Sequence, residues 1–460
     1  MLRSLIGTKS FYRRVFALTI PIMIQNGITN LVSMLDNIMV GRIGTVEMTG
    51  VAVTNQLIFV FNLCIFGAIS GAGIFGAQFY GNGDHKGVQH TFRFKLVFCA
   101  MLTIFSIALL YFKGDALANL YLKGDGSVED AAASLLYSKK YMRVMLIGLI
   151  PYALTQCYSS TLRETGQTVL PMTAGVVAVA VNLCLNSVLI FGYLGAPRLG
   201  VVGAAIATVI SRFVELLVVA IWTRVKSKEN QFILGAYSSL YVPRKLIGQI
   251  FLKGGPLMVK ETLCACGIAM LNQCFSVRGI DVVAANNISQ TFFNVFSVAF
   301  MSVGVAIGII LGQMLGSGDT EGARTASRQL MAFSVFISVI VSIVYILLAE
   351  VIPNVYNTTE TVRHTATRLM QICALVMPLD AFANASYFTL RSGGKAFITM
   401  IFDSCFVWAI CVPVAFILTR YTTLGILIVF AICQSLNIIK CILGYVLVKK
   451  GIWIKNIVNN

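Results

Sequence analysis

Four acidic residues stand inside long apolar stretches of this sequence, where charged groups are rare. They are Asp36, Glu261, Asp380 and Asp403. A charge at the centre of a membrane span costs about 2.5–3.5 kcal/mol, so each acid must face a polar interior or a partner. Burial disfavours the charged form of a carboxyl group, which can then take up a proton in one state and release it in another. Such residues are suited to coupling the movement of one cation to that of another.

Amide side chains accompany these acids. Asn182 and Asn186 are four residues apart and share one face of a helix. Amides offer both donors and acceptors without adding charge, so they suit a polar interior. We expect five of them to contact a substrate or to line a polar cavity: Gln25, Asn26, Asn182, Asn186 and Asn272. Asp403 is expected to be structural, since it lies close enough to the inner face to be hydrated.

The elements that must position these residues are membrane-spanning helices. The chain has 460 residues, of which 57% are hydrophobic and only 12% charged, with a mean hydropathy of +0.84. Apolar stretches of about 20 residues recur throughout, each long enough to cross about 30 Å of hydrocarbon. Long continuous apolar runs, such as the one from Ala174 to Gly192, are not the strict alternation of a membrane β-barrel. The sequence therefore predicts an all-α integral membrane protein.

Twelve spans are expected, at 15–40, 50–80, 91–112, 135–160, 168–192, 200–223, 251–277, 282–314, 328–350, 365–390, 397–418 and 424–448. The first follows several basic residues and continues for a full membrane width, so we do not expect a cleavable signal peptide. Basic residues concentrate in alternate loops, above all between residues 224 and 253. By the positive-inside rule, both termini are then cytoplasmic and the loop at 113–134 lies outside.

An internal repeat divides the chain. The segment 78–84, with Gly87 and Arg93 after it, reappears at 313–319 with Gly322 and Arg328, at a constant offset of 235 residues. Such self-similarity indicates a duplicated architecture. Two further pairs follow the same order: Pro21-Ile22-Met23 with Pro256-Leu257-Met258, and Thr161-Leu162-Arg163 with Thr389-Leu390-Arg391.

We therefore expect an amino-terminal six-helix lobe at 1–223, a basic cytoplasmic linker at 224–250 and a carboxy-terminal six-helix lobe at 251–460. Six helices per half means that both copies enter the membrane from the same side. The two lobes should be related by a pseudo-two-fold axis along the membrane normal. The offset places Glu261 opposite Asn26 and, with one residue of slippage, Asp36 opposite Asn272, so the two lobes differ chemically.

The motifs of this repeat resemble those of the multidrug and toxic compound extrusion (MATE) family, over nearly the whole length. They include the runs 21–26, 36–44 and 71–73, followed by Ala77-Gln78 and the turn at 81–84. The resemblance is to NorM-like and DinF-like bacterial efflux proteins. It implies a two-lobe helical bundle in the cell membrane, which in a bacterium is the inner membrane. It also implies secondary active export of small amphipathic organic cations in exchange for protons or sodium ions, by a monomer.

The resemblance assigns roles to individual residues. Asp36 matches the first-helix aspartate of the family, and Asp380 precedes Arg391 by the same eleven residues as the tenth-helix aspartate of the NorM-like branch. Both are expected to couple cation movement. Asn182 and Asn186 resemble a residue pair of one family branch, in which the second position is an aspartate. Here that position is the amide Asn186, so the sequence departs from that branch's proton site.

Glu261 follows Pro256 by five residues, as in some bacterial branches, whereas the NorM-like branch places its glutamate farther along the helix. It is a third expected coupling residue and, with Asp380, a candidate sodium ligand. A salt bridge to a neighbouring helix is the alternative. Lys260 beside it points about 100° away along an ideal helix, so spacing alone does not pair the two.

The sequence lacks the residues that other classes of function require. The chain has three histidines and no zinc-protease motif, and the turn at 81–84 lacks the lysine and Ser/Thr of a phosphate loop. The 12 cysteines are scattered mostly within apolar spans and suggest neither a metal site nor a disulfide framework. The charge of +17 is explained by loop orientation, so no nucleic-acid partner, nucleotide or organic cofactor is expected and membrane lipid is the surrounding partner.

Two alternative functions remain open. A flippase for lipid-linked oligosaccharides shares the superfamily's architecture, but its cavity should be more cationic to meet pyrophosphate, and Lys260 is the main cation on the expected cavity helices. An intramembrane lipid-modifying enzyme would need clustered acids or a nucleophile–base pair near the interface, and the sequence offers neither. We therefore predict a transporter and not an enzyme.

Overall fold

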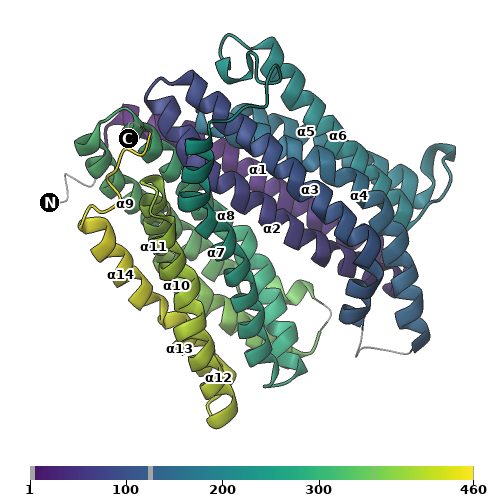
Figure 1. The fold of residues 1–460 in the computed structure, drawn as a ribbon. Coiled ribbons are helices and arrows are strands. Elements are labelled where there is room, and N and C mark those ends of the chain that lie inside the picture. The colour runs from purple at the N-terminus through teal and green to yellow at the C-terminus, as the bar shows by residue number, and fades with distance from the viewer. Residues whose placement is uncertain (1–5, 123–127, 357, 459–460) are drawn as a thin grey trace. The chain divides into compact units, whose positions relative to one another are not determined.

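The computed structural model describes residues 6–122, 128–356 and 358–458, and long helices make up most of them (Figure 1). The first ten are α1 (Lys9–Gly41), α2 (Thr45–Gly81), α3 (His85–Leu122), α4 (Val128–Glu164), α5 (Val169–Phe191), α6 (Val201–Val225), α7 (Arg244–Ser276), α8 (Ile280–Gly316), α9 (Thr320–Leu348) and α10 (Glu360–Ser392). An eleventh segment is continuous from α11 (Ala396–Met400) to α12 (Val412–Tyr421). The twelfth comprises α13 (Ile426–Ser435) and α14 (Asn437–Lys449).

The all-α membrane class predicted from composition is confirmed. Within the described residues, ten helices are long and apolar enough to cross a membrane. α1 and α4 complete the set of twelve long segments, and each carries basic residues in its first half. α7 begins at Arg244, earlier than the predicted 251, because Arg244 and Lys245 in its first turn lower the hydropathy there. Residues 123–127 of the predicted outer loop lie outside the described residues.

Two π-helical turns interrupt the eleventh segment. They are η5 (Ile401–Cys405) and η6 (Val407–Cys411), and α12 follows directly with Pro413 in its first turn. Proline has no N–H to donate, so the regular hydrogen-bond ladder cannot continue through this point. π-Helical turns widen a helix locally and change the direction in which its side chains point. One of them contains Asp403.

The sequence repeat corresponds to a repeated backbone. After α2, Asn82 donates to the Gln78 carbonyl and Gly83 has φ +74°; after α8, Ser317 donates to the Gln313 carbonyl and Gly318 has φ +82°. Left-handed backbone favours glycine, which explains why both copies have one there. Each turn ends at an aspartate that accepts a hydrogen bond from the backbone N–H three residues later: Asp84 from Gly87 and Asp319 from Gly322, both at 2.9 Å.

Contacts divide the described chain into two compact units. The amino-terminal unit consists of Ile24–Gly76 and Asp84–Gly248; the carboxy-terminal unit consists of the described residues of Met1–Met23, of Ala77–Gly83 and of Gln249–Asn460. In the first, α4 packs against α3 and α6, and α5 against α6. In the second, α10 packs against α8, α9 and α14, as Figure 1 shows. The expected lobe boundaries and their pseudo-two-fold relation stay predictions.

Two helix ends cross closely within the carboxy-terminal unit. A Cβ added to Gly81 at the end of α2 would lie 2.0 Å from the carbonyl oxygen of Gln313, and one added to Gly316 at the end of α8 would lie 2.0 Å from that of Gln78. These four residues are equivalent under the 235-residue offset, so the contact is reciprocal. Only glycine allows backbones to approach to this distance.

Candidate functional site

In the amino-terminal unit, Asp36 of α1 is joined to the amides of α5. Asn186 Nδ2 donates to Asp36 Oδ1 at 2.6 Å and to Asn182 Oδ1 at 3.0 Å. Asn182 Nδ2 in turn donates to Thr208 Oγ1 of α6 at 3.3 Å. Both asparagines are buried, and the 3.6-residue period of α5 places them on one face. The sequence-predicted acid and two of the predicted amides therefore form one polar chain across three helices.

No ion-pair partner for Asp36 is found in the part of the chain that the structure describes. The amide oxygen of Asn186 likewise has no hydrogen-bond partner among the described residues, although it is buried. Buried polar atoms normally find partners. A carboxylate and a free amide oxygen on adjacent helices are therefore placed where a proton or another cation could bind and leave.

Gln25 and Asn26 do not join this chain. Gln25 is buried on α1, where its Oε1 accepts a hydrogen bond from Arg163 Nη2 at 3.0 Å. Arg163 belongs to one of the repeated motifs, so this contact ties a repeat residue to the first helix. Asn26 is partly exposed on the next position of α1.

In the carboxy-terminal unit, Glu261 lies in a network of alternating charges. Lys260 Nζ is 3.2 Å from Glu261 Oε1 and 3.0 Å from Asp403 Oδ2. Lys440 of α14 contacts the other oxygen of Asp403. The neighbouring residues on α7 thus do pair, although ideal helix geometry separates them. Asp403 thus has two cationic partners within the membrane span. Lys440 on α14 is only partly exposed and pairs with Asp403 on a neighbouring helix, as a charge inside a span must.

Asp380 and Asn272 have amide partners instead. Asn437 Nδ2 of α14 donates to Asp380 Oδ1 at 2.8 Å, and Asn286 Nδ2 of α8 donates to Asn272 Oδ1 at 3.1 Å. Asp380 therefore resembles Asp36 in being held by an asparagine of a neighbouring helix. The structure gives Glu261 and Asp380 different partners, a lysine and an amide. Their joint role as sodium ligands stays a prediction.

One buried ion pair was missed by sequence reasoning. Lys95 Nζ of α3 donates to both carboxylate oxygens of Glu164 at the end of α4, at 2.6 and 2.7 Å. Ser160 and Thr161 complete the lysine's contacts. The lysine side chain is fully buried and the glutamate's 7% exposed. A lysine inside a predicted span was the signal that could have revealed it, because such a charge must find a partner.

The comparisons with known proteins agree with this architecture. The MatE family model matches residues 21–188 and 256–417, well over half of the chain. A probable multidrug resistance protein NorM of Thermotoga maritima is 28% identical over 420 residues, covering 90% of this chain and 87% of that protein. Multidrug resistance protein NorM of Aliivibrio fischeri is 27% identical over 414 residues, covering 88% and 86%.

Solved structures share the fold at lower identity. An outward-facing multidrug resistance MATE family transporter of the MOP superfamily has a TM-score of 0.85 at 20% identity, over 97% of this chain and 98% of that one. A MOP superfamily transporter of Pyrococcus furiosus, whose reported binding-pocket polarity is reversed, has a TM-score of 0.83 at 20% identity, over 97% of each chain. The family that the sequence motifs predicted is confirmed: this chain belongs to the MatE family, whose members are membrane transporters and not enzymes.

Proposed function

We propose that this protein is a secondary active multidrug efflux antiporter of the cell membrane. It exports small amphipathic organic cations in exchange for protons or sodium ions, as a monomer whose termini both lie in the cytoplasm. Family membership and the multidrug resistance names of the NorM relatives support efflux of small molecules. The basic segment between α6 and α7 supports the orientation.

The observation that carries the proposal is the environment of Asp36. This carboxylate lies within an apolar helix, is bonded by one neutral amide and has no ion-pair partner among the described residues. An acid whose charge is already balanced would gain little from binding a further cation. Asp36 instead offers one uncompensated negative charge, for which a proton and an organic cation would compete.

Competition for one carboxylate is sufficient for exchange. If the coupling ion and the cargo each bind Asp36 and cannot do so together, binding of one releases the other. Each ligand shifts the conformational equilibrium only by its differential affinity for the two states. With the coupling ion bound to Asp36 in place of the cargo, the transporter can return to its first state without cargo. Asn186 and Asn182 keep the carboxylate oriented through both halves of such a cycle.

The proposal is tested in proteoliposomes by following ethidium movement under an imposed proton or sodium gradient. Asp36→Asn keeps an oxygen that can accept from Asn186 but removes the charge, so we expect ethidium transport to fall to the level of empty vesicles. Asp115→Asn is the matched control, since Asp115 is 54% exposed and pairs with Lys139 at the surface. Unchanged transport by Asp36→Asn would contradict the proposed site.

Lipid-linked oligosaccharide export is the competing outcome of the same assay. Wild-type vesicles that move no organic cation under either gradient, but translocate a fluorescent lipid-linked sugar, would replace multidrug efflux by flippase activity.

A further inference from the structure

The ammonium group of Lys260 lies where a small cation would be expected in the carboxy-terminal unit. Two carboxylate oxygens are close to its Nζ, Glu261 Oε1 at 3.2 Å and Asp403 Oδ2 at 3.0 Å. The centroid of the Tyr387 ring is 4.4 Å away, within cation–π range. The lysine side chain is only 10% exposed. Carboxylate oxygens and an aromatic face are also surroundings that an alkali cation favours.

The charges of this network already balance. Lys260 and Lys440 supply two positive charges, and Glu261 and Asp403 two negative ones. A sodium ion among these carboxylates would meet one ammonium group directly and a second across Asp403. Like charges this close disfavour each other's binding. Glu261 and Asp403 therefore do not fit a sodium ion while Lys260 is present.

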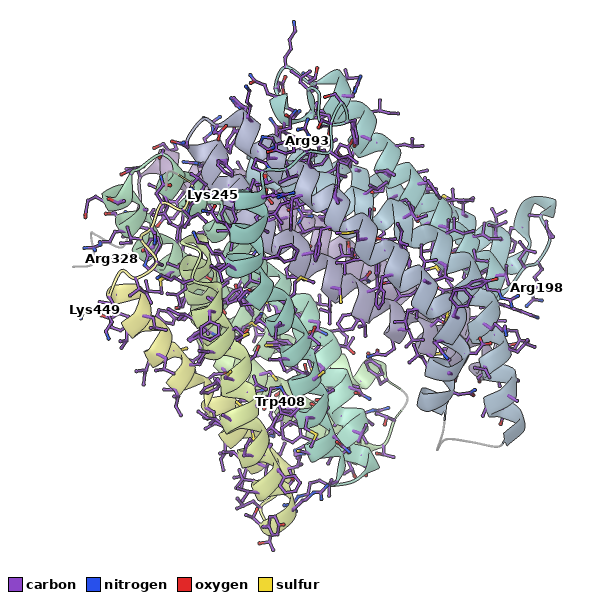
Figure 2. The ribbon with its side chains drawn as sticks, in the orientation of Figure 1. Arg93, Arg198, Lys245, Arg328, Trp408 and Lys449 are labelled. Atoms are coloured by element: carbon purple, nitrogen blue, oxygen red, sulfur yellow. The ribbon has the colours of Figure 1, made fainter. Side chains whose placement is uncertain are left out.

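The backbone around Lys260 is held by the helix that carries Asp403. Ser404 Oγ donates to the Lys260 carbonyl at 3.0 Å, and Trp408 Nε1 donates to the Leu263 carbonyl at 2.9 Å. Figure 2 labels Trp408, in the segment between α11 and α12. The π-helical turns η5 and η6 bring Asp403, Ser404 and Trp408 to the same side of α7. The lysine is thus fixed relative to both carboxylates and is not a mobile surface charge.

We propose that Lys260 is a specificity-determining residue for the coupling ion. Its ammonium group takes the place of an alkali cation in the carboxy-terminal unit, so that transport does not depend on sodium. This inference rests on the proposed antiport function: with no sodium site at Glu261, exchange is left to Asp36, and we infer that its coupling ion is the proton. It replaces the Glu261 part of the expected sodium site, whereas Asp380, which accepts a hydrogen bond from Asn437, lies outside this network of described ion pairs.

The first test is sodium binding, which does not require transport. Purified protein in detergent is titrated with ²²Na⁺ in KCl of constant ionic strength. We expect no sodium-specific binding by the wild type. Lys260→Met keeps the length of the side chain but leaves a net negative charge, and we expect its sodium affinity to exceed that of the wild type by at least about tenfold. A wild type that binds sodium specifically would overturn the proposal, whether or not the variant folds.

Two further variants separate position from charge. Lys440→Met removes the same charge from the network but leaves Lys260 between the two carboxylates, so we expect its sodium binding to match the wild type. The double variant Lys260→Met/Glu261→Gln restores the charge balance and should lose the sodium binding gained by Lys260→Met. Equal gains in Lys260→Met and Lys440→Met would contradict the assignment to Lys260.

Transport provides the second readout. Ethidium movement by the wild type should follow a proton gradient and ignore a sodium gradient, whereas Lys260→Met should respond to sodium. Failure of all forms to move ethidium would count against multidrug efflux and leave the binding result standing. Wild-type transport driven by sodium would instead contradict the role of Lys260 while supporting efflux.

Discussion

The buried pair of Lys95 and Glu164 depends on two glycines of α2. A Cβ added to Gly73 would lie 2.6 Å from Glu164 Oε1, and one added to Gly76 would lie 2.1 Å from Oε2. The glutamate therefore fits against bare backbone, and its carboxylate can reach the ammonium group on α3 without exposure to lipid. This pair joins α2, α3 and α4 at one point, where a neutral residue could not offer the same contacts.

Glu164→Gln is expected to destabilise the protein by about 3–5 kcal/mol, because it leaves the Lys95 ammonium buried without an opposite charge. Lys95→Met/Glu164→Gln should recover much of that loss. Thermal unfolding in detergent measures both. Glu229→Gln is the matched control, since Glu229 and Lys226 form an ion pair at the surface, each 49% exposed. We expect that change to cost less than about 1 kcal/mol; a similar loss in both single variants would contradict the prediction.

The crossing of α2 and α8 is a tightly constrained contact in the carboxy-terminal unit. Gly81 and Gly316 each face a backbone carbonyl oxygen, which cannot move aside as a flexible side chain can. Arg14 of α1 adds a hydrogen bond from Nη2 to Gln313 Oε1, at 2.7 Å. The ends of three helices are thus fixed together.

Alanine at Gly81 or Gly316 is expected to force the two helices apart and destabilise the protein by about 1–3 kcal/mol, or to prevent folding. Gly255→Ala on α7 is the control, because no atom lies within 4 Å of the added Cβ. Alanine has a higher helix propensity than glycine, so Gly255→Ala should be as stable as the wild type or more stable. Fluorescence-detected size-exclusion chromatography after heating compares the three. Equal behaviour would mean that the helices separate without cost.

The chain after α14 packs against the same helix ends. Gln78 is fully buried, and its side chain donates to the Ser392 carbonyl at 2.9 Å and to the Lys455 carbonyl at 3.1 Å. Its Oε1 accepts from the Ile457 backbone N–H at 2.8 Å. One repeated glutamine thereby connects α2 and α10 to the segment that follows α14.

Gln78→Ala should destabilise the protein by about 1–3 kcal/mol, because it leaves buried backbone groups without partners. We also expect faster proteolysis of the segment at 451–458, since local protection depends on its contacts. Limited digestion followed by mass spectrometry detects the cleavage. Gln56→Ala on the same helix is the control, because Gln56 is exposed. Cleavage at equal rates in both variants would exclude Gln78 as the anchor.

At the scale of the whole molecule, the sequence predicts elements better than partners. The repeated motifs predict matching turns, and the structure has them: Gly166 and Gly394 both adopt left-handed backbone after Arg163 and Arg391. Hydropathy predicts the spans because lipid imposes length and polarity on every helix. Asp36 and Asn186 are both recognisable as polar residues in apolar helices, but they are 150 residues apart and only tertiary packing brings them together.

The network around Lys260 shows why the rest could not be predicted. Helical spacing turns Lys260 away from Glu261, and a regular helix would place Asp403 differently from the π-helical turn that contains it. The long side chains of Lys260 and Lys440 then pair with the carboxylates that lie within reach. No period or motif in one sequence encodes such a departure from ideal geometry, so the lysine's role follows only from coordinates.

The orientation of the whole chain is the last testable consequence of its charge pattern. Arg198 lies before α6 and Lys245 lies after it in the amino-terminal unit; Figure 2 labels both residues. An epitope inserted after the exposed Ser239, in the basic segment after α6, should bind antibody only in permeabilised cells. One inserted after Arg198 lies on the other side of α6 and should be labelled in intact cells. An epitope added at the carboxy terminus should behave as the one at Ser239, because an even number of helices separates the two. The reverse pattern would mean that the basic segment faces outward and would contradict the proposed orientation, although the inward proton gradient would still set the direction of exchange.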